Sequence, residues 1–198
     1  MTRETLGAAA LPASYTYLKR PDTPEILAKA LNHYGVKEYP GSADNRTILG
    51  WRDELLLAYP HLSWIKDVIE GDATPWCGLF MAYIAHQAGY GAPHRRFLTA
   101  RSWAEWPFGL CVLTNVARLG DILVFWRGSR DGQAGHVGLY VGEDDTHFHV
   151  LGGNQTDSVS ITRIARTRLL RVVRPVNVSG QRRVIRTPDM ADITDNEA

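Results

Sequence analysis

Cys77 is the residue in this chain best placed to act as a nucleophile. It lies in "TPWCGLFMAYIAHQAGY", residues 74–90, directly before a long apolar run that predicts a helix. A cysteine nucleophile needs a lowered pKa, a base within hydrogen-bond reach and usually a group that orients the base. The start of a helix favours a lowered pKa, because unpaired N–H groups and the helix dipole stabilise a thiolate. Cysteine is also among the most buried residue types, so Cys77 can instead be inert packing.

His136 is the candidate base. It opens "GHVGLYVG", residues 135–142, whose β-branched and aromatic residues predict a strand. The glycines beside it would let another element approach closely. A histidine that only satisfies its hydrogen bonds at a sheet edge would give the same pattern. His86 is a poorer choice, because it lies on the same predicted helix as Cys77, about two and a half turns further on.

Two residues compete for the third position. Asn154, in "VLGGNQ" after the next predicted strand, has an amide oxygen that can accept from an imidazole N–H and fix its tautomer. Gly-Gly-Asn is also prone to form a turn, so Asn154 can be an ordinary turn residue. His149 lies within that strand, and His147 lies two residues earlier on the same face. We expect Asn154 to orient the base, with His149 as the alternative.

The histidines also raise the question of a metal. His147 and His149 have a spacing that zinc sites use, and His136 is a third candidate ligand. No nearby carboxylate or cysteine completes a recognisable motif, and neither a GxxxxGK[ST] loop nor a GxGxxG motif occurs. The sequence therefore predicts no metal site and no cofactor.

Composition excludes several classes of partner. The formal net charge of the 198 residues is +1, so no bulk field attracts nucleic acid. No apolar segment reaches the roughly 18 residues of a membrane span, and the N-terminus does not look like a signal peptide. Two cysteines are too few for a disulfide scaffold, and a bridge between Cys77 and Cys111 would consume the thiol. Localisation stays unassigned; a target outside the cytoplasm would have to be reached by export, injection or lysis.

Helices are predicted before strands, which indicates an α+β fold. Helical patterns cover 23–35, 47–69 with an interruption near Pro60, and 78–88; Thr23 is the expected cap of the first and Pro24 its first residue. Strand patterns cover 119–128, 135–144, 145–155, 158–166 and 168–176. We expect residues 1–22 to be a flexible lead-in, 23–176 to form one catalytic domain, and 177–198 to be a polar tail, either flexible or docking.

Taken together, these segments resemble a known family. "TPWCGLFMAYIAHQAGY", "LGDILVFWRG", "GHVGLYVGEDDTHFHVLGGNQTDSVSI" and "RLLRVVRP" follow one another as in the papain-like cell-wall hydrolases of the NlpC and CHAP (cysteine, histidine-dependent amidohydrolase/peptidase) type. The stretch "HYGVKEYPGSADNRTILGW" also resembles the lead-in of one bacterial and phage branch of that group. The resemblance covers roughly residues 24 to 176.

The resemblance implies a papain-like fold, with N-terminal helices and the nucleophile at a helix start packed on an antiparallel sheet. It implies cleavage of amide bonds in peptidoglycan stem peptides, as an endopeptidase or an N-acetylmuramoyl-L-alanine amidase. Cys77 matches the nucleophile, His136 the general base, and Asn154 the third position through "LGGNQ". NlpC-type relatives often have a histidine there, which favours His149, and Gly152 stands at about the place where CHAP-type relatives often have an acid.

Two further expectations concern the surroundings of this site. Trp76 and Trp103 are candidate walls of a substrate groove, although aromatic residues more often belong to the core. The alternative to a hydrolase is a non-catalytic structural or binding module of a phage particle or secretion system with the same fold. Expected partners are peptidoglycan stem peptides and, depending on context, a phage or secretion-system component or an immunity protein. The cell wall or periplasm is the expected site of action.

Overall fold

The computed structural model describes residues 11–41, 43–91, 94–176, 178–185 and 192–193. The helices are α1 (Glu25–Leu31), α2 (Arg46–Ala58) and α3 (Cys77–Gln87), with 3-10 helices η2 (Ala13–Lys19), η3 (Pro60–Lys66), η4 (Ala100–Glu105) and η5 (Arg166–Arg168). The strands are β1 (Gly109–Val112), β2 (Ile122–Trp126), β3 (Gly135–Glu143), β4 (His147–Gly152), β5 (Ser160–Ala165), β6 (Leu169–Pro175) and β7 (Asp192–Ile193). Among these residues, no helix combines the length and apolar character needed to cross a bilayer.

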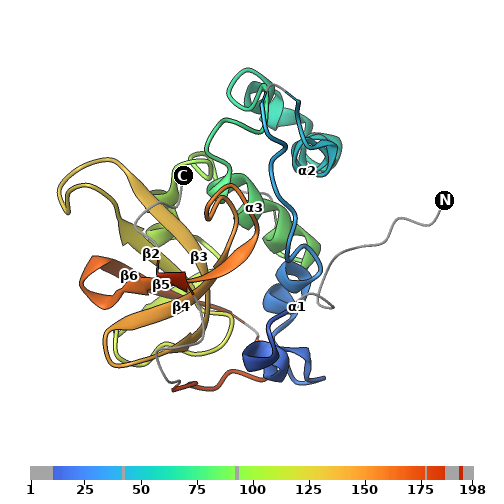
Figure 1. The fold of residues 1–198 in the computed structure, drawn as a ribbon. Coiled ribbons are helices and arrows are strands. Elements are labelled where there is room, and N and C mark those ends of the chain that lie inside the picture. The colour runs from blue at the N-terminus through green and yellow to red at the C-terminus, as the bar shows by residue number, and fades with distance from the viewer. Residues whose placement is uncertain (1–10, 42, 92–93, 177, 186–191, 194–198) are drawn as a thin grey trace.

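The strands form one sheet in the order β1-β6-β2-β3-β4-β5-β7. Neighbouring strands from β1 to β5 pair antiparallel, and only the short β7 pairs parallel, with β5. Figure 1 shows the three helices gathered on one side of this sheet. The predicted α+β class and antiparallel sheet are therefore confirmed.

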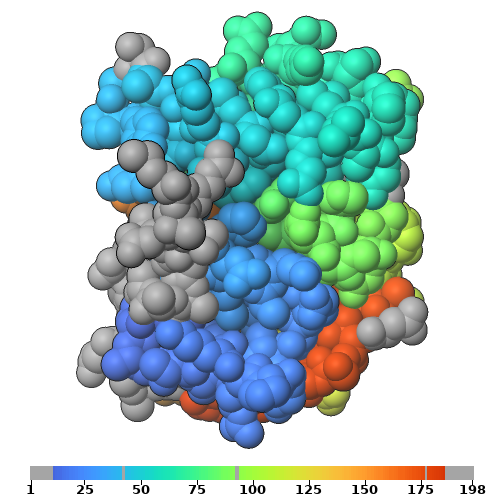
Figure 2. All heavy atoms as spheres, turned by 90° about the vertical axis from the view of Figure 1, so that its right-hand side faces the viewer, coloured from blue at the N-terminus to red at the C-terminus, as the bar shows by residue number. Residues whose placement is uncertain are grey.

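Helix α3 is the central helix of the molecule. It packs against β3 and β4 and is itself covered by α1 and α2. All residues from Cys77 to Ala85 are buried, as expected of a helix that is apolar all round. Figure 2, which views the molecule from the helical side, shows that segments from the first half of the chain form most of that face. The core thus lies between the sheet and α3, and it holds the start of α3 firmly in place.

The first predicted helix begins differently from expected. Helix α1 starts at Glu25 with Pro24 in the cap position. The Thr23 hydroxyl donates to the Leu18 carbonyl (2.8 Å) and does not cap the helix. The prediction of Thr23 as the cap, and of Pro24 as the first helical residue, is therefore wrong. Helix α2 does have a side-chain cap, because Asn45 accepts a hydrogen bond from the Thr47 N–H (2.8 Å).

The N-terminal lead-in is ordered from residue 11 onward. It forms η2, whose Tyr15 and Leu18 side chains are buried. The Tyr17 hydroxyl donates to the Val141 carbonyl of β3. The prediction of a flexible lead-in over 1–22 is therefore wrong for 11–22, because these aromatic residues cover sheet surface that would otherwise be exposed; residues 1–10 lie outside the described part.

Residues 178–185 of the tail dock on the domain. The Leu119 N–H donates to the Arg182 carbonyl (2.9 Å), and the Glu143 N–H donates to the Val184 carbonyl (2.9 Å). Gly180 has φ +74°, and a Cβ there would lie 1.6 Å from the Asp22 carbonyl oxygen, so only glycine fits. The tail thus meets the N-terminal segment, and the two run side by side in Figure 1, blue against red. Residues 178–185 of the predicted tail therefore pack on the domain.

Candidate functional site

Cys77 is the first residue of α3, as the sequence predicts. Two glycines allow other segments to press against the start of this helix. A Cβ on Gly78 would lie 2.3 Å and 2.6 Å from the carbonyl oxygens of residues 97 and 98. A Cβ on Gly153, after β4, would lie 2.6 Å from the Trp76 ring. The position of the thiol is therefore set by backbone packing that no larger residue would permit.

The structure brings the Cys77 sulfur to the start of β3. The backbone N–H groups of Gly78 and Val137 act on the sulfur and lower the pKa of the thiol. Val137 directly follows His136, so the expected nucleophile and the expected base come from adjacent pieces of backbone. A thiol–imidazole mechanism needs the two side chains close together, so this proximity of the two backbone segments is a necessary condition for it.

The protonation state of Cys77 differs from the expectation. Burial raises the pKa of the Cys77 thiol to about 11, although hydrogen bonds from Gly78 and Val137 and the charge of Arg127 act to lower it. Cys77 is 6% exposed and His136 is 0% exposed. The expected lowering of the pKa by the helix start is therefore wrong, because desolvation of the charged form outweighs the helix N–H groups. The resting thiol is neutral at pH 7.

Gln155 holds the imidazole of His136. The His136 Nε2 atom lies 3.1 Å from Gln155 Oε1. The Gln155 amide nitrogen donates to the carbonyls of Val150 and Ser160, and the Thr162 hydroxyl donates to Oε1 (2.9 Å). Because Oε1 can only accept, Nε2 of His136 must carry a proton. In the neutral ring the basic lone pair is then on Nδ1, which is also buried.

Gly152 makes room for this contact. A Cβ at position 152 would lie 3.0 Å from His136 Nε2 and 3.1 Å from Gln155 Oε1. By the sequence resemblance, Gly152 stands at about the place where CHAP-type sequences often have an acid. In this chain an amide oxygen from Gln155 lies beside the imidazole, and a side chain at residue 152 would crowd it.

Asn154, the preferred third residue, has another partner. In the amide orientation that satisfies both neighbours, its oxygen accepts from the Trp76 backbone N–H (3.1 Å) and its nitrogen donates to Glu38 (3.2 Å). Its backbone has φ 60°, a conformation that asparagine tolerates better than most residues. Asn154 thus fixes the residue before Cys77, and the hydrogen bond to His136 Nε2 comes from its neighbour Gln155.

His149, the alternative third residue, belongs to a different buried cluster. Its Nδ1 lies 2.7 Å from the Tyr15 hydroxyl and its Nε2 lies 3.0 Å from Asp144. Asp144 also forms an ion pair with Arg163 at 2.8 Å. We call these four residues the Asp144 cluster. It ties the N-terminal segment to β4 and β5, and both ring nitrogens of His149 are engaged in it.

The two tryptophans expected to form groove walls are core residues. Trp76 and Trp103 are both fully buried. The Trp76 indole N–H donates to Glu38 (2.6 Å), and the Trp103 indole N–H donates to the Phe97 carbonyl (2.8 Å). The prediction that they form the walls of an open groove is wrong, because both rings are buried in the core. The sequence pattern alone does not distinguish a core tryptophan from one in a groove.

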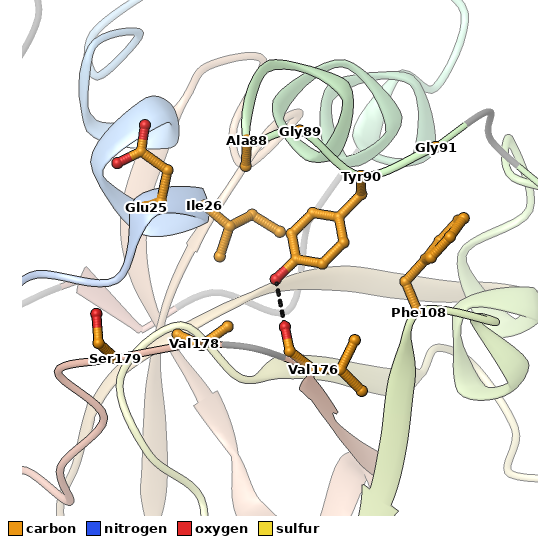
Figure 3. Close-up of a pocket in the computed structure, with 10 residues that line it drawn as sticks. All are labelled: Glu25, Ile26, Ala88, Gly89, Tyr90, Gly91, Phe108, Val176, Val178 and Ser179. Atoms are coloured by element: carbon orange, nitrogen blue, oxygen red, sulfur yellow. Dashed lines mark hydrogen bonds between the residues drawn. The ribbon is translucent and has the colours of Figure 1, made fainter.

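One pocket of the molecule lies at the opposite end of α3. Figure 3 shows it between Glu25 and Ile26 of α1, the glycine-flanked turn after α3, and the segment after β6; the Tyr90 hydroxyl donates to the Val176 carbonyl across it (3.2 Å). Helix α3 has 11 residues, so this pocket begins roughly 15 Å along the helix from Cys77. It cannot serve as the substrate site for that thiol.

The described histidines and cysteines show neither a metal-binding arrangement nor a disulfide bond. Within the described residues, no group of three or more His, Cys, Asp or Glu side chains is arranged to hold a metal ion. Both cysteines are free thiols, Cys77 buried and Cys111 exposed. The Cys77 sulfur is thus not consumed by a disulfide bond.

Comparisons of the chain with protein-family models, with curated proteins and with solved structures gave no significant match. Function is therefore inferred from the site itself and from the sequence resemblance.

Alkylation should show the raised pKa directly. A thiol with a pKa of about 11 is ionised in roughly one molecule in ten thousand at pH 7, so iodoacetamide should modify Cys77 more slowly than the exposed Cys111. The rate at Cys77 should keep rising with pH up to about 11. Mass spectrometry of modified peptides, with Cys111→Ser to isolate the Cys77 signal, measures both rates. Faster labelling of Cys77 at pH 7 would instead show a resting thiolate.

Proposed function

We propose that this protein is a papain-like cysteine hydrolase that cleaves amide bonds in peptidoglycan stem peptides. The observation that carries the proposal is the position of Cys77 at the start of α3, where the backbone N–H of Val137 lowers the thiol pKa, next to a histidine whose Nε2 lies 3.1 Å from Gln155 Oε1. The site thus offers a nucleophile, a base and an orienting group in the order that thiol hydrolysis uses. The substrate class comes from the resemblance to NlpC- and CHAP-type hydrolases. Both an endopeptidase and an amidase are compatible with it.

The mechanism follows from the protonation states. Since the resting thiol is neutral, Nδ1 of His136 takes its proton as the sulfur attacks the carbonyl carbon. The negative oxygen that develops is stabilised by the backbone N–H of Cys77, at the start of α3. The imidazolium, held by Gln155, then donates its proton to the leaving amine. Water, deprotonated by His136, hydrolyses the thioester and releases the new carboxylate.

Access to the sulfur requires movement of the surrounding side chains. Cys77 is only 6% exposed and His136 is fully buried, so a substrate carbonyl cannot reach the sulfur in the closed arrangement. In a hydrolase, substrate binding therefore has to open the site. The same burial favours the second candidate function, a non-catalytic module of a phage particle or secretion system that has kept the fold.

Digestion of purified sacculi separates the two functions. A hydrolase should release soluble peptides, and mass spectrometry of the products should find one new amine and one new carboxylate per cut. A product ending at the muramoyl link identifies an amidase, and a cut within the stem identifies an endopeptidase. Release of no fragments from sacculi of different stem compositions would reject the hydrolase and leave the structural module.

Gln155 should affect turnover more than binding. Gln155→Ala removes the acceptor that fixes the His136 tautomer, so kcat should fall on the order of 10²-fold while KM changes little. Thr162→Val is the graded comparison, because it removes only the hydroxyl that supports Gln155 Oε1 and should cost less. Steady-state kinetics on muropeptides, together with thermal melting of each variant, measures this. An unchanged kcat in folded Gln155→Ala would remove Gln155 from the mechanism.

A further inference from the structure

A strongly basic pocket opens on the surface near the start of α3. Its volume is about 350 Å³, within the size range of ligand sites. We call it the arginine pocket. Its lining includes His94, Arg95, Arg96, Arg101, Glu105 and Gln133. They come from the segment before η4, from η4 itself and from the loop before β3.

The walls of the arginine pocket continue into the two elements that carry the thiol and the imidazole. On one side, the carbonyls of residues 97 and 98 press on Gly78, the neighbour of Cys77. On the other side, the Arg101 Nε donates to the Ala134 carbonyl (2.8 Å), two residues before His136. A Cβ on Gly135 would lie 3.0 Å from Arg101 Cγ, so the contact is close. The pocket therefore adjoins the candidate active site.

The charge of the pocket is positive. Its lining includes three arginines, Arg95, Arg96 and Arg101, and one carboxylate, that of Glu105. Burial, with a further contribution from the charge of Arg96, lowers the pKa of His94, so this histidine is neutral at pH 7. The charge of Arg127 also reaches the Cys77 sulfur, which extends the positive field to the nucleophile.

The arginines of the pocket divide into a fixed one and two available ones. Arg101 donates to the carbonyls of Ser129, Arg130 and Ala134, which holds the loop before β3. Arg95 and Arg96 are exposed, and neither forms an ion pair with another described residue. Their planar guanidinium groups can therefore donate paired N–H···O hydrogen bonds to a carboxylate.

We propose that the arginine pocket binds a carboxylate of the peptide substrate beside the amide bond that Cys77 attacks. This inference rests on the proposed function and narrows it: the preferred substrate is an acidic peptide with a free carboxylate close to the scissile bond. A stem peptide in which that carboxylate is amidated should bind less well. A cationic group at the same place is disfavoured by the three guanidinium charges.

Binding to an inactive variant tests the subsite without requiring turnover. The probes are synthetic L-alanyl-γ-D-glutamyl-L-lysine with a free α-carboxylate and the same peptide as its α-amide, titrated calorimetrically into Cys77→Ala protein. The free acid should bind roughly tenfold or more tightly than the amide, since charge-assisted hydrogen bonds are lost in the amide. Adding Arg95→Gln and Arg96→Gln should abolish this preference, and added salt should reduce it.

Arg171→Gln is the matched control, because Arg171 is an exposed arginine on β6 that does not line the pocket. It should keep the preference for the acid. Equal binding of the two peptides, or a preference that survives the double substitution, would overturn the proposal. Digestion of sacculi by the unmodified protein tests the hydrolase activity separately. If the protein binds the acid selectively but releases no fragments, the carboxylate-binding site stands and only the proposed hydrolase activity is rejected.

Discussion

Cys77→Ala is expected to abolish the release of peptides from sacculi, with a loss of more than about 10³-fold in kcat/KM. Without the sulfur no thioester can form, and water alone must attack the amide. Cys77→Ser should be nearly as poor, because a neutral hydroxyl is a weaker nucleophile in the same place. Chromatography and mass spectrometry of soluble muropeptides over time give the rates.

Cys111→Ser is the control for this experiment. Cys111 is exposed, so its replacement should leave both rate and stability unchanged. Thermal melting must show that the Cys77 variants remain folded. If folded Cys77→Ala protein released fragments at more than about a tenth of the original rate, a cysteine mechanism would be excluded.

Asp144→Ala is expected to lower the free energy of unfolding by about 3–5 kcal/mol. Asp144 is buried and bonds with both His149 and Arg163. Its removal leaves the largely buried Arg163 guanidinium without its carboxylate partner, which is more costly than losing a surface ion pair. Urea unfolding followed by fluorescence measures the change. Asp53→Ala is the matched control, since the Asp53 carboxylate pairs with Arg52 at 2.8 Å but is 57% exposed, and it should cost less than about 1 kcal/mol.

The Asp144 cluster should also make the stability of the fold depend on pH in the acid range. Burial alone would raise the pKa of Asp144, but hydrogen bonds from Arg163, His149 and the backbone N–H groups of Thr146 and His147 hold it well below its usual value. Because the folded pKa is lower than the unfolded one, this stabilisation is present above about pH 4 and lost as pH falls toward the folded pKa. Asp144→Asn should therefore show a shallower loss of stability below pH 4. Parallel acid slopes in the two proteins would contradict this role.

The elements with strong periodicity were predictable from sequence. The apolar run after Cys77 and the alternating, β-branched segments of β2 to β6 gave the helix and the strands near their observed bounds. Strand β1 and η4 were not predicted, because short elements carry too little pattern. The pairing of the Cys77 region with the start of β3 followed from the family resemblance and could not be read from spacing alone.

The side chain that contacts His136 Nε2 could not be predicted from sequence. Asn154, Thr156 and Asp157 all have positive φ, so the turn after β4 departs from the alternation that a strand pattern assumes. The side chain that meets His136 is therefore that of Gln155, one position later in "LGGNQ". Likewise, the pKa of Cys77 depends on how completely the tertiary structure removes the thiol from water. Its position at the helix start predicts a lowered pKa, whereas burial raises it.

The contact between Asp22 and Gly180 has a practical consequence for the size of the folding unit. Arg182 pairs with Asp22 at 3.0 Å, and Tyr15 closes over His149 from the same end of the chain. A fragment of residues 23–176 would lack Tyr15, which covers the buried imidazole of His149. It would also lose the backbone hydrogen bonds that residues 182 and 184 accept from Leu119 and Glu143. The folding unit therefore includes residues 11–22 and 178–185, and a fragment of residues 23–176 should be less stable than the whole chain.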